Sequence, residues 1–232
     1  MNLIVPAMAG LALALSGPAM AADGARAPAK GRKPAVQAVK LPVPQPSQAA
    51  VQVADWVAGA KDNHGLPYII VDKVNAAAFL FDAGGKPLAA APVLIGIAPG
   101  DEATPGVGAK SLAEIGPAEK TTPAGRFLAR FGLAAGRQRV LWVDYATSVA
   151  LHMIPPGNPR EKRRQRMLSP DIADNRITFG CINVPKSFYG RIAPLFGKKG
   201  GYVYVLPDTK PIEAIFPRLR VQPFLKAAAQ DG

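Results

Sequence analysis

Cysteine, histidine and aromatic residues are scarce in this 232-residue sequence, which has one cysteine, two histidines and 7% aromatic residues. A single cysteine cannot form an internal disulfide, so Cys181 is either a small buried side chain or a reactive thiol. One cysteine and two histidines far apart in the chain give no metal-ligand pattern, and no cofactor motif is present, so we expect neither a metal nor a cofactor. The low aromatic content offers no base-stacking surface, which argues against a nucleic-acid partner.

The first 21 residues contain no charged side chain and resemble a signal peptide. An apolar run is followed by Ala19-Met20-Ala21, the small-x-small pattern of a cleavage site. A retained membrane anchor is the alternative, because no basic residue precedes the run, but prolines and glycines interrupt it. We therefore predict cleavage after Ala21, export to the periplasm and no stable membrane insertion.

Acidic residues are also few, 16 against 28 basic residues, and the formal net charge is +12. The predicted signal peptide carries none of this charge, so the exported chain keeps it. A surplus of this size favours an anionic partner. In the periplasm the candidates are the cell wall and anionic lipid head groups.

The length suits one globular domain with short flanking segments. Residues 22–46 are rich in Ala, Pro and Lys and have few large apolar side chains, so we predict a disordered tether. We place the folded domain at residues 47–206 and a C-terminal tail at residues 207–232. The domain is predicted to begin with a helix over residues 48–62, capped by Ser47. The buried face of this helix is predicted to comprise Val53, Trp56, Val57 and Ala60.

From Pro67 onward the sequence changes to short β-prone runs separated by turn residues. The segment DAGGKP, residues 82–87, is typical of a hairpin turn between two such runs. This rhythm predicts a mostly β fold, a largely antiparallel β-sandwich or barrel with short helices. The predicted strands are residues 68–72, 77–82, 92–97, 125–131, 140–144, 149–154 and 201–207.

Two segments interrupt this rhythm. Residues 98–122 form a long polar loop, a kind of segment that often has a binding role. Residues 155–175 contain the run NPREKRRQRM, for which we predict a short basic helix. A further helix is predicted over residues 184–197, with Pro185 near its first turn, where proline is favoured.

The residues around Cys181 are of the kind that activates a thiol. A thiol with an ordinary pKa of about 8.5 is mostly protonated at neutral pH, so a catalytic cysteine needs a base or a positive potential beside it. We predict that Cys181 lies just before the N-terminus of the helix over residues 184–197, with Asn183 as a cap. Gly180 would allow a tight turn whose backbone N–H groups face an oxyanion.

The base that Cys181 needs at neutral pH is one of the two histidines. His64 lies in a predicted turn between the first helix and the first strand. His152 lies near the end of a predicted strand, with Leu151 and Met153 on the opposite face, and is the better candidate. The alternative is that Cys181 is a buried small hydrophobe and His152 a structural residue.

The motifs TFGCIN, ALHMI and TTPAGRF resemble those of the L,D-transpeptidase catalytic (YkuD-type) family of cell-wall enzymes, over residues 66–206. The family pairs a histidine with a later Ser/Thr-His-Gly-Cys-hydrophobic-Asn/Arg block, and has a Thr-Pro-x-Gly turn upstream. The matching residues are His152, Thr178, Gly180, Cys181, Ile182, Asn183, Pro123 and Gly125. The resemblance implies a mostly β catalytic domain with Cys181 as nucleophile and His152 as general base and acid.

Three departures from the family pattern stand out. Met153 replaces the usual small residue after the histidine, although the backbone carbonyl that orients the imidazole in the family is available from any residue. Phe179 occupies the position of the usual second histidine. The 25 residues between His152 and Thr178 exceed the usual spacing, and the excess contains the basic run PREKRRQR. A surface excursion of this length is compatible with the fold.

The resemblance implies an acyl-transfer reaction on peptidoglycan stem peptides. Cys181 would attack the carbonyl before a terminal D-alanine, release D-alanine and form a thioester. An amine of a neighbouring stem would then attack the thioester and form a 3-3 cross-link. Water as the acceptor would make the protein an L,D-carboxypeptidase or a related wall hydrolase, and an idle cysteine would leave a non-catalytic wall-binding module.

The residues that the resemblance puts in the substrate region are Thr178, Phe179, Asn183, Arg176 and Met153. For Thr178 and Asn183 a local hydrogen bond or a brace is the simpler interpretation. Arg176 could bind a substrate carboxylate. The cluster Arg160, Lys162, Arg163, Arg164 and Arg166 is either a solvated helix face or a rim that attracts acidic stem peptides.

Overall fold

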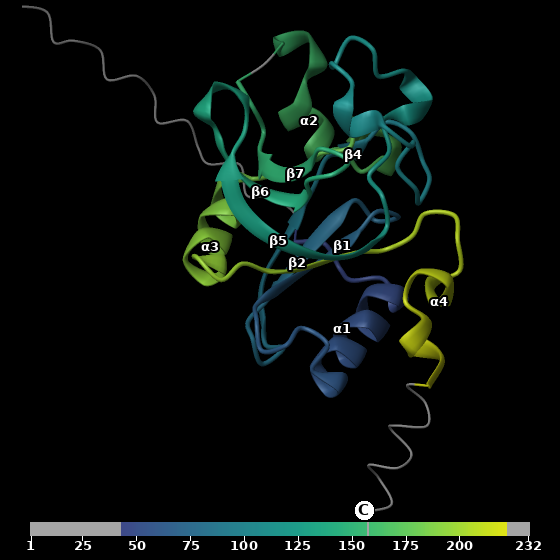
Figure 1. The fold of residues 1–232 in the computed structure, drawn as a ribbon, viewed down its shortest axis with the longest axis vertical. Helices are drawn as coiled ribbons and strands as arrows, with labels where there is room; N and C mark the ends of the chain where they lie inside the picture. The colour runs from purple at the N-terminus through teal and green to yellow at the C-terminus, as the bar shows by residue number, and fades with distance from the viewer. Residues whose placement is uncertain (1–42, 157, 222–232) are drawn as a thin grey trace, which may run out of the picture. The chain divides into compact units, whose positions relative to one another are not determined.

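The structure, a computed structural model, describes residues 43–156 and 158–221, and these form a curled β-sheet with a few short helices (Figure 1). Eight strands follow the spatial order β3-β2-β1-β10-β5-β6-β7-β9, and β4 and β8 form a separate pair. The strands are β1 (Tyr68–Asp72), β2 (Ala77–Phe81), β3 (Pro87–Pro92), β4 (Ile95–Gly96), β5 (Gly125–Leu133), β6 (Arg139–Asp144), β7 (Val149–Met153), β8 (Arg176–Thr178), β9 (Ile182–Val184) and β10 (Gly201–Val205).

Most neighbouring strands in the sheet are antiparallel, and the parallel pairs are β1 with β10, β7 with β9 and β4 with β8. The two edges of the large sheet approach each other. Leu94, just after edge strand β3, exchanges both backbone hydrogen bonds with Asn183 of edge strand β9, at 3.0 and 2.8 Å. This link makes the sheet a near-barrel and ties β9 from two sides.

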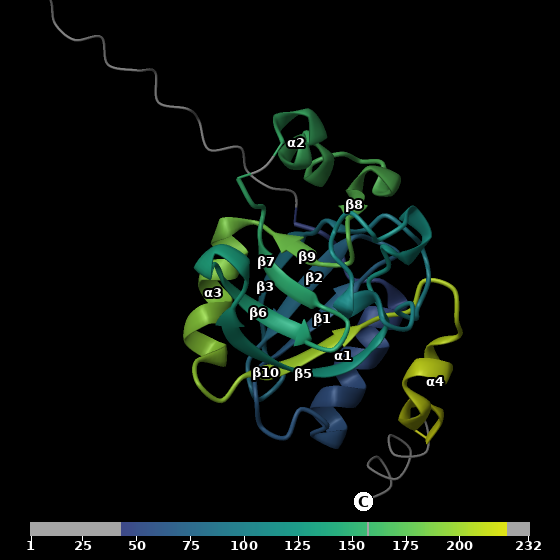
Figure 2. The ribbon, with the colours of Figure 1, turned by 45° about the horizontal axis from the view of Figure 1, so that its top comes forward.

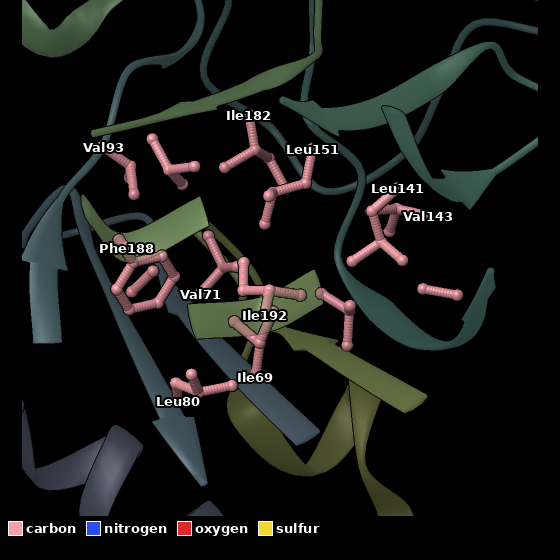
Figure 3. Close-up of a cluster of buried hydrophobic side chains, with 14 of the residues drawn as sticks. Ile69, Val71, Leu80, Val93, Leu141, Val143, Leu151, Ile182, Phe188 and Ile192 are labelled. Atoms are coloured by element: carbon pink, nitrogen blue, oxygen red, sulfur yellow. The ribbon is translucent and has the colours of Figure 1, made fainter. Parts of the chain in front are cut away.

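The interior of the curled sheet is a mostly aliphatic core (Figure 3). Ile69 and Val71 of β1, Leu151 of β7 and Ile182 of β9 are fully buried there. Helix α3 (Lys186–Phe196) closes this core with Phe188, Ile192 and Phe196. Burial of such side chains stabilises the fold by about 1.5–3 kcal/mol each.

A second core covers the other face of the central strands, which are therefore buried on both sides. The covering elements are α1 (Gln48–Ala60), α4 (Ile212–Ile215) and a 3-10 helix at Pro217–Val221. Trp56 of α1 packs against Tyr204 of β10 and against Phe216, with ring centroids 5.9 and 6.0 Å apart. The C-terminal segment thus packs on the domain as far as Leu219.

The remaining helices are short and lie in the connections. Helix α2 (Arg163–Met167) projects at the end of the molecule opposite α1 (Figures 1 and 2). The 3-10 helices in the loops are Val107–Ala109, Pro117–Glu119, Ala135–Arg137, Pro159–Glu161 and Ile172–Asn175.

The predicted mostly β, barrel-like fold with short helices and a leading helix is confirmed. Ser47 caps α1 by accepting a hydrogen bond from the Ala50 N–H at 3.1 Å, which satisfies one of the free donors of the first turn. The predicted buried face of α1 was wrong in one position, because Ala60 is exposed and Ala50 is buried instead. The hairpin turn is confirmed, with Asp82 Oδ1 accepting from the N–H groups of Gly84 and Lys86.

The strand prediction was wrong in three places. The hairpin leads into β3 at residues 87–92, whereas the predicted strand 92–97 contains only the two-residue β4. Strands β8 and β9 were not predicted at all. The predicted basic helix corresponds to α2, and α3 begins at Lys186 with Pro185 as its N-cap.

The predicted signal peptide at residues 1–21 and most of the predicted tether at residues 22–46 lie outside the described residues, as does the end of the tail at residues 222–232. The domain boundaries stay predictions. In the part of the chain that the structure describes, no helix is long and apolar enough to span a bilayer.

Candidate active site

The pairing of β7 with β9 brings His152 and Cys181 to one face of the sheet. The two strands are parallel, with Leu151 opposite Ile182 and His152 opposite Asn183. Leu151 and Ile182 point into the aliphatic core, so the alternation of strand side chains puts His152, Asn183 and Cys181 on the other face. Residues about 30 positions apart in sequence are therefore close neighbours on this face.

The imidazole of His152 is held in one tautomer. His152 Nδ1 lies 2.7 Å from the carbonyl oxygen of Met153, and because a carbonyl only accepts, Nδ1 carries the proton. His152 Nε2 lies 3.3 Å from the amide nitrogen of Asn183, which only donates, so Nε2 is an unprotonated acceptor. Nε2, the ring nitrogen bonded to Asn183, is therefore the basic one, and an unprotonated nitrogen is what a general base requires.

The pKa of His152 is lowered from its ordinary value. Burial is the largest cause, and the positive charge of Arg163 acts in the same direction, while the hydrogen bond to Met153 opposes them. The ordinary histidine pKa is already below neutrality. At neutral pH His152 is thus an uncharged base.

The thiol of Cys181 is partly buried and lies 3.7 Å from the carbonyl oxygen of Ser148, to which it donates. Burial raises the pKa of this thiol, whereas a hydrogen bond with the backbone of Ala150 and the charge of Arg163 lower it. Because the raised pKa lies above neutrality, the resting pair is a neutral thiol beside a neutral imidazole. A thiol in this state would need a neighbouring base to remove its proton before or during an attack.

The expectation of a helix N-terminus behind Cys181 was wrong. Strand β9 intervenes, and α3 begins five residues after the cysteine, at Lys186. The favourable potential of a helix end fades within about one turn. Asn183 caps no helix and instead bonds to side chains on the β7 and α2 side of the site.

The turn from Thr178 to Cys181 is braced by two threonine hydroxyls. Thr178 Oγ1 donates to the Cys181 carbonyl at 2.6 Å and accepts from the Gly180 N–H at 3.2 Å. Thr122 Oγ1 donates to the Gly180 carbonyl at 2.8 Å and accepts from the Gly96 N–H at 2.9 Å. The N–H of Gly180, predicted to face an oxyanion, is thus bonded to Thr178.

Two other predicted substrate residues are engaged by neighbours. The ring of Phe179 lies under Lys120 of the long polar loop, with the ammonium nitrogen 3.9 Å from the ring centroid. Arg176 Nη2 donates to Asp208 Oδ1 at 2.8 Å. Phe179 therefore ties the 98–122 loop to the cysteine turn, and Arg176 ties β8 to the segment after β10.

The basic insertion reaches into the site through Arg163. Its Nη1 donates to Asn183 Oδ1 at 2.7 Å, and its Nε pairs with Glu161 at 2.6 Å. The side chain is only 14% exposed, so Arg163 departs from the predicted solvated helix face. A pocket of about 300 Å³ lies between the end of β7 and this insertion. It is lined by Ile154, Pro155, Asn158, Pro159, Glu161, Lys162, Arg163, Arg164 and Gln165.

The second histidine lies apart from these residues. His64 follows α1, is exposed, and packs its ring 5.8 Å from that of Tyr202. Across residues 43–156 and 158–221, no group of three or more His, Cys, Asp or Glu side chains is arranged to hold a metal ion. Of the two histidines, both of which the structure describes, only His152 lies on the same face of the sheet as the Cys181 thiol.

Sequence reasoning missed three contributors to this site. Thr122 directly precedes the Pro123 of the recognised motif, so its position in that motif was the available signal. Ser148 contributes only its backbone carbonyl, and because every residue type has one, the sequence gives no sign of this contact. Arg163 and Asn183 are 20 residues apart in the sequence. Nothing in the sequence distinguishes Arg163 from the other arginines of the basic run.

No protein-family model and no curated protein matches this chain. It is similar to the crystal structure of an L,D-transpeptidase from Xylanimonas cellulosilytica, with 14% identity and a TM-score of 0.36, over 72% of this chain and 64% of that one. It is also similar to the structure of Bd1075 from Bdellovibrio bacteriovorus, with 14% identity and a TM-score of 0.38, over 69% of this chain and 55% of that one. The chain thus spans less than two thirds of the length of either structure.

Proposed function

We propose that this protein is a peptidoglycan L,D-transpeptidase that uses Cys181 as nucleophile and His152 as general base. The observation that carries the proposal is the parallel pairing of β7 with β9, which puts His152 and Cys181, directly before β9, on one face, with Nε2 of His152 unprotonated. The match of TFGCIN and ALHMI to the family motifs supports the same assignment.

The reaction follows from the resting protonation states. As Cys181 Sγ forms its bond to the carbonyl carbon before the terminal D-alanine, its proton passes to His152 Nε2, whose contact with Asn183 is released. Protonated His152 then gives this proton to the nitrogen of D-alanine as the C–N bond breaks and a thioester forms. Attack of an acceptor amine on the thioester forms the new amide, and the amine's proton returns through His152 to Cys181.

The surroundings of the dyad suit a peptide substrate with carboxylates. The pocket between the end of β7 and the basic insertion combines apolar lining residues, Ile154, Pro155 and Pro159, with the basic Lys162 and Arg164. The net charge of +12 favours an anionic polymer as partner. With the predicted signal peptide, this supports action on the cell wall in the periplasm.

Product analysis with a stem tetrapeptide tests the proposal. The full chain is incubated with the tetrapeptide, with and without an added amine acceptor, and D-alanine and cross-linked products are quantified. We expect D-alanine release in step with amide formation. Cys181→Ala should abolish release, and His152→Ala should slow it by about 100-fold or more, the usual contribution of a general base.

The same assay separates transfer from hydrolysis. D-Alanine release with no amide product would identify an L,D-carboxypeptidase using the same dyad. Release that persists in Cys181→Ala, or wall binding with no release by the wild type, would contradict the proposed function.

A further inference from the structure

The basic insertion carries a side chain that is built into the site. Arg163 lies in the first turn of α2, and its guanidinium contacts Asn183 in the buried strand β9. The contact is anchored on the insertion side, because Glu161 pairs with Arg163 Nε and the Glu161 carbonyl accepts from Arg166 Nε at 3.1 Å. Met167 is buried and holds the end of α2 in place.

Arg163, Asn183, His152 and Met153 form one chain of hydrogen bonds with a fixed direction. A guanidinium only donates, so Asn183 must turn its Oδ1 toward Arg163 and its Nδ2 toward His152. The amide nitrogen only donates, so His152 Nε2 must accept, and Nδ1 must then donate to the Met153 carbonyl. The distances along this chain are 2.7, 3.3 and 2.7 Å.

We propose that Arg163 is a positioning residue that acts through Asn183 to hold His152 as the neutral Nδ1-protonated tautomer, whose unprotonated Nε2 takes the Cys181 proton once its contact with Asn183 is released. This inference deepens the proposed function and rests on it. Without Arg163, the Asn183 amide is free to turn its oxygen toward Nε2. That arrangement favours a proton on Nε2, which removes the base.

The charge of Arg163 works in the same direction as this hydrogen bonding. It opposes protonation of His152 and favours the thiolate of Cys181, so both pKa values are lower with Arg163 present than without it. Arg163 belongs to the insertion that lengthens the spacing between His152 and Thr178. The insertion therefore contributes to the dyad itself, in addition to any role of its exposed basic side chains.

Nitrogen NMR of the histidine rings tests this proposal without a substrate. The chain has only His64 and His152, so a full chain labelled with ¹⁵N-histidine gives two ring systems, and the exposed His64 serves as an internal reference. The variants are Arg163→Gln, Arg163→Lys, which keeps the positive charge, and the control Arg137→Gln, an exposed arginine in the turn between β5 and β6.

In the wild type at neutral pH we expect an unprotonated Nε2 and a protonated Nδ1 on His152. In Arg163→Gln the His152 titration should move to higher pH, and alkylation of Cys181 by iodoacetamide at pH 7 should slow by roughly fivefold, the factor for one ordinary hydrogen bond. Arg163→Lys should recover part of both effects. Arg137→Gln should leave the titration of His152 and the alkylation rate unchanged.

Two results would overturn the inference. One is a wild-type His152 that is protonated on Nε2 at neutral pH. This result is observable in the wild type without any variant. The other is a His152 titration that is the same in Arg163→Gln and wild type, with the His64 resonances showing that both are folded. Failure of the proposed function would be seen in a different experiment, the stem-tetrapeptide assay, in which the wild type would release no D-alanine.

Discussion

Burial shifts the pKa values of Cys181 and His152 in opposite directions. It raises the pKa of the thiol and lowers the pKa of the imidazole, because a low-dielectric site disfavours the charged form of each group. The site therefore differs from thiolate–imidazolium pairs that are charged at rest. Proton transfer and attack on the carbonyl are coupled in such a neutral pair, and the orientation of His152 matters as much as its basicity.

Gly180 is the residue whose backbone the site depends on most directly. Its φ of 120° is a conformation that L side chains rarely adopt, and an added Cβ would lie 2.7 Å from the Thr121 carbonyl oxygen. We expect Gly180→Ala to lower the free energy of unfolding by about 1–3 kcal/mol and to slow acylation of Cys181. Denaturant unfolding and intact-mass kinetics measure the two effects.

Gly190 provides the matched control for that substitution. It lies inside α3, and an added Cβ meets no atom within 4 Å. Gly190→Ala should raise the free energy of unfolding by up to about 1 kcal/mol, as alanine favours a helix, with no change in the acylation rate. Equal stability losses in the two variants would contradict the assigned role of the Gly180 turn.

At the residue scale, much of the candidate site could be predicted from the sequence. Residue type and motif spacing single out Cys181, His152 and the Met153 carbonyl, and the structure brings these three residues to one region. The contacts of Thr122 and Arg163 could not be predicted, because each depends on a long-range approach in space. The expected helix dipole at Cys181 failed for a local reason, since Asn183 and Val184 extend a strand before Pro185 opens α3.

At the scale of elements, the cysteine turn is held against the long polar loop by Thr122. This hydroxyl links β4 to the turn by accepting from Gly96 and donating to the Gly180 carbonyl. The Thr122 carbonyl in turn accepts from the buried Lys73 at 2.9 Å. One residue thus joins β4, the loop before β5 and the β8–β9 turn.

Replacing Thr122 by valine keeps its shape and removes both hydroxyl bonds. Leaving the Gly96 N–H and the Gly180 carbonyl without this partner should cost about 1–3 kcal/mol of unfolding free energy. We also expect slower acylation of Cys181, because the turn loses its brace. Thr122→Ser, which keeps the hydroxyl, should retain most of the rate, and a serine variant as slow as the valine variant would show that the hydroxyl is not the cause.

The strands that the sequence revealed are those with long apolar or β-branched runs, such as β1 and β10, which are buried on both faces. Strands β8 and β9 have three residues each, too few for an alternating pattern to be distinguished from a loop. Strand β3, PLAAAP, has small side chains and two prolines, which are typical of loops. This segment becomes a strand because the hairpin pairs it with β2, and a strand at the edge of a sheet tolerates proline.

At the scale of the whole molecule, a buried ionic cluster ties the loop after β4 to the segment after β10. Lys73 is fully buried and pairs with Asp101 at 3.0 Å and with Asp208 at 3.4 Å. Asp101 also accepts from the backbone N–H groups of Asp208, Thr209 and Lys210 at 2.5, 2.9 and 2.7 Å. The cluster satisfies charges that would otherwise be costly to bury.

Asp101 makes the stability of the molecule sensitive to acid. Burial on its own would raise the pKa of this carboxyl, but the hydrogen bonds that it accepts from residues 208–210 hold the pKa well below its ordinary value of 3.8. A carboxyl with a lowered folded-state pKa stabilises the fold above its unfolded-state pKa and loses this effect as the pH falls below it. We therefore expect stability to be steady from pH 7 to about 5 and to fall below about pH 4.

Denaturant unfolding of wild type and Asp101→Asn across this range measures the effect. The variant should be less stable by about 3–5 kcal/mol at pH 7, since it leaves Lys73 without its nearest charge partner. The difference should narrow below pH 4, because the Asp101 carboxyl of the unfolded wild type takes up a proton there while the folded one stays ionised. A difference that stays constant down to pH 2 would contradict the role of the Asp101 charge.

Intact-protein mass spectrometry after incubation with a carbapenem tests most directly whether Cys181 and His152 form an acyl-accepting pair. The resemblance to L,D-transpeptidases implies that such a drug acylates the catalytic cysteine. We expect one adduct on the full-length wild type, none on Cys181→Ala, and slow formation on His152→Ala. An adduct that persists in Cys181→Ala, or a wild-type Cys181 inert both to the drug and to small thiol reagents, would contradict the assignment and leave a wall-binding module as the explanation.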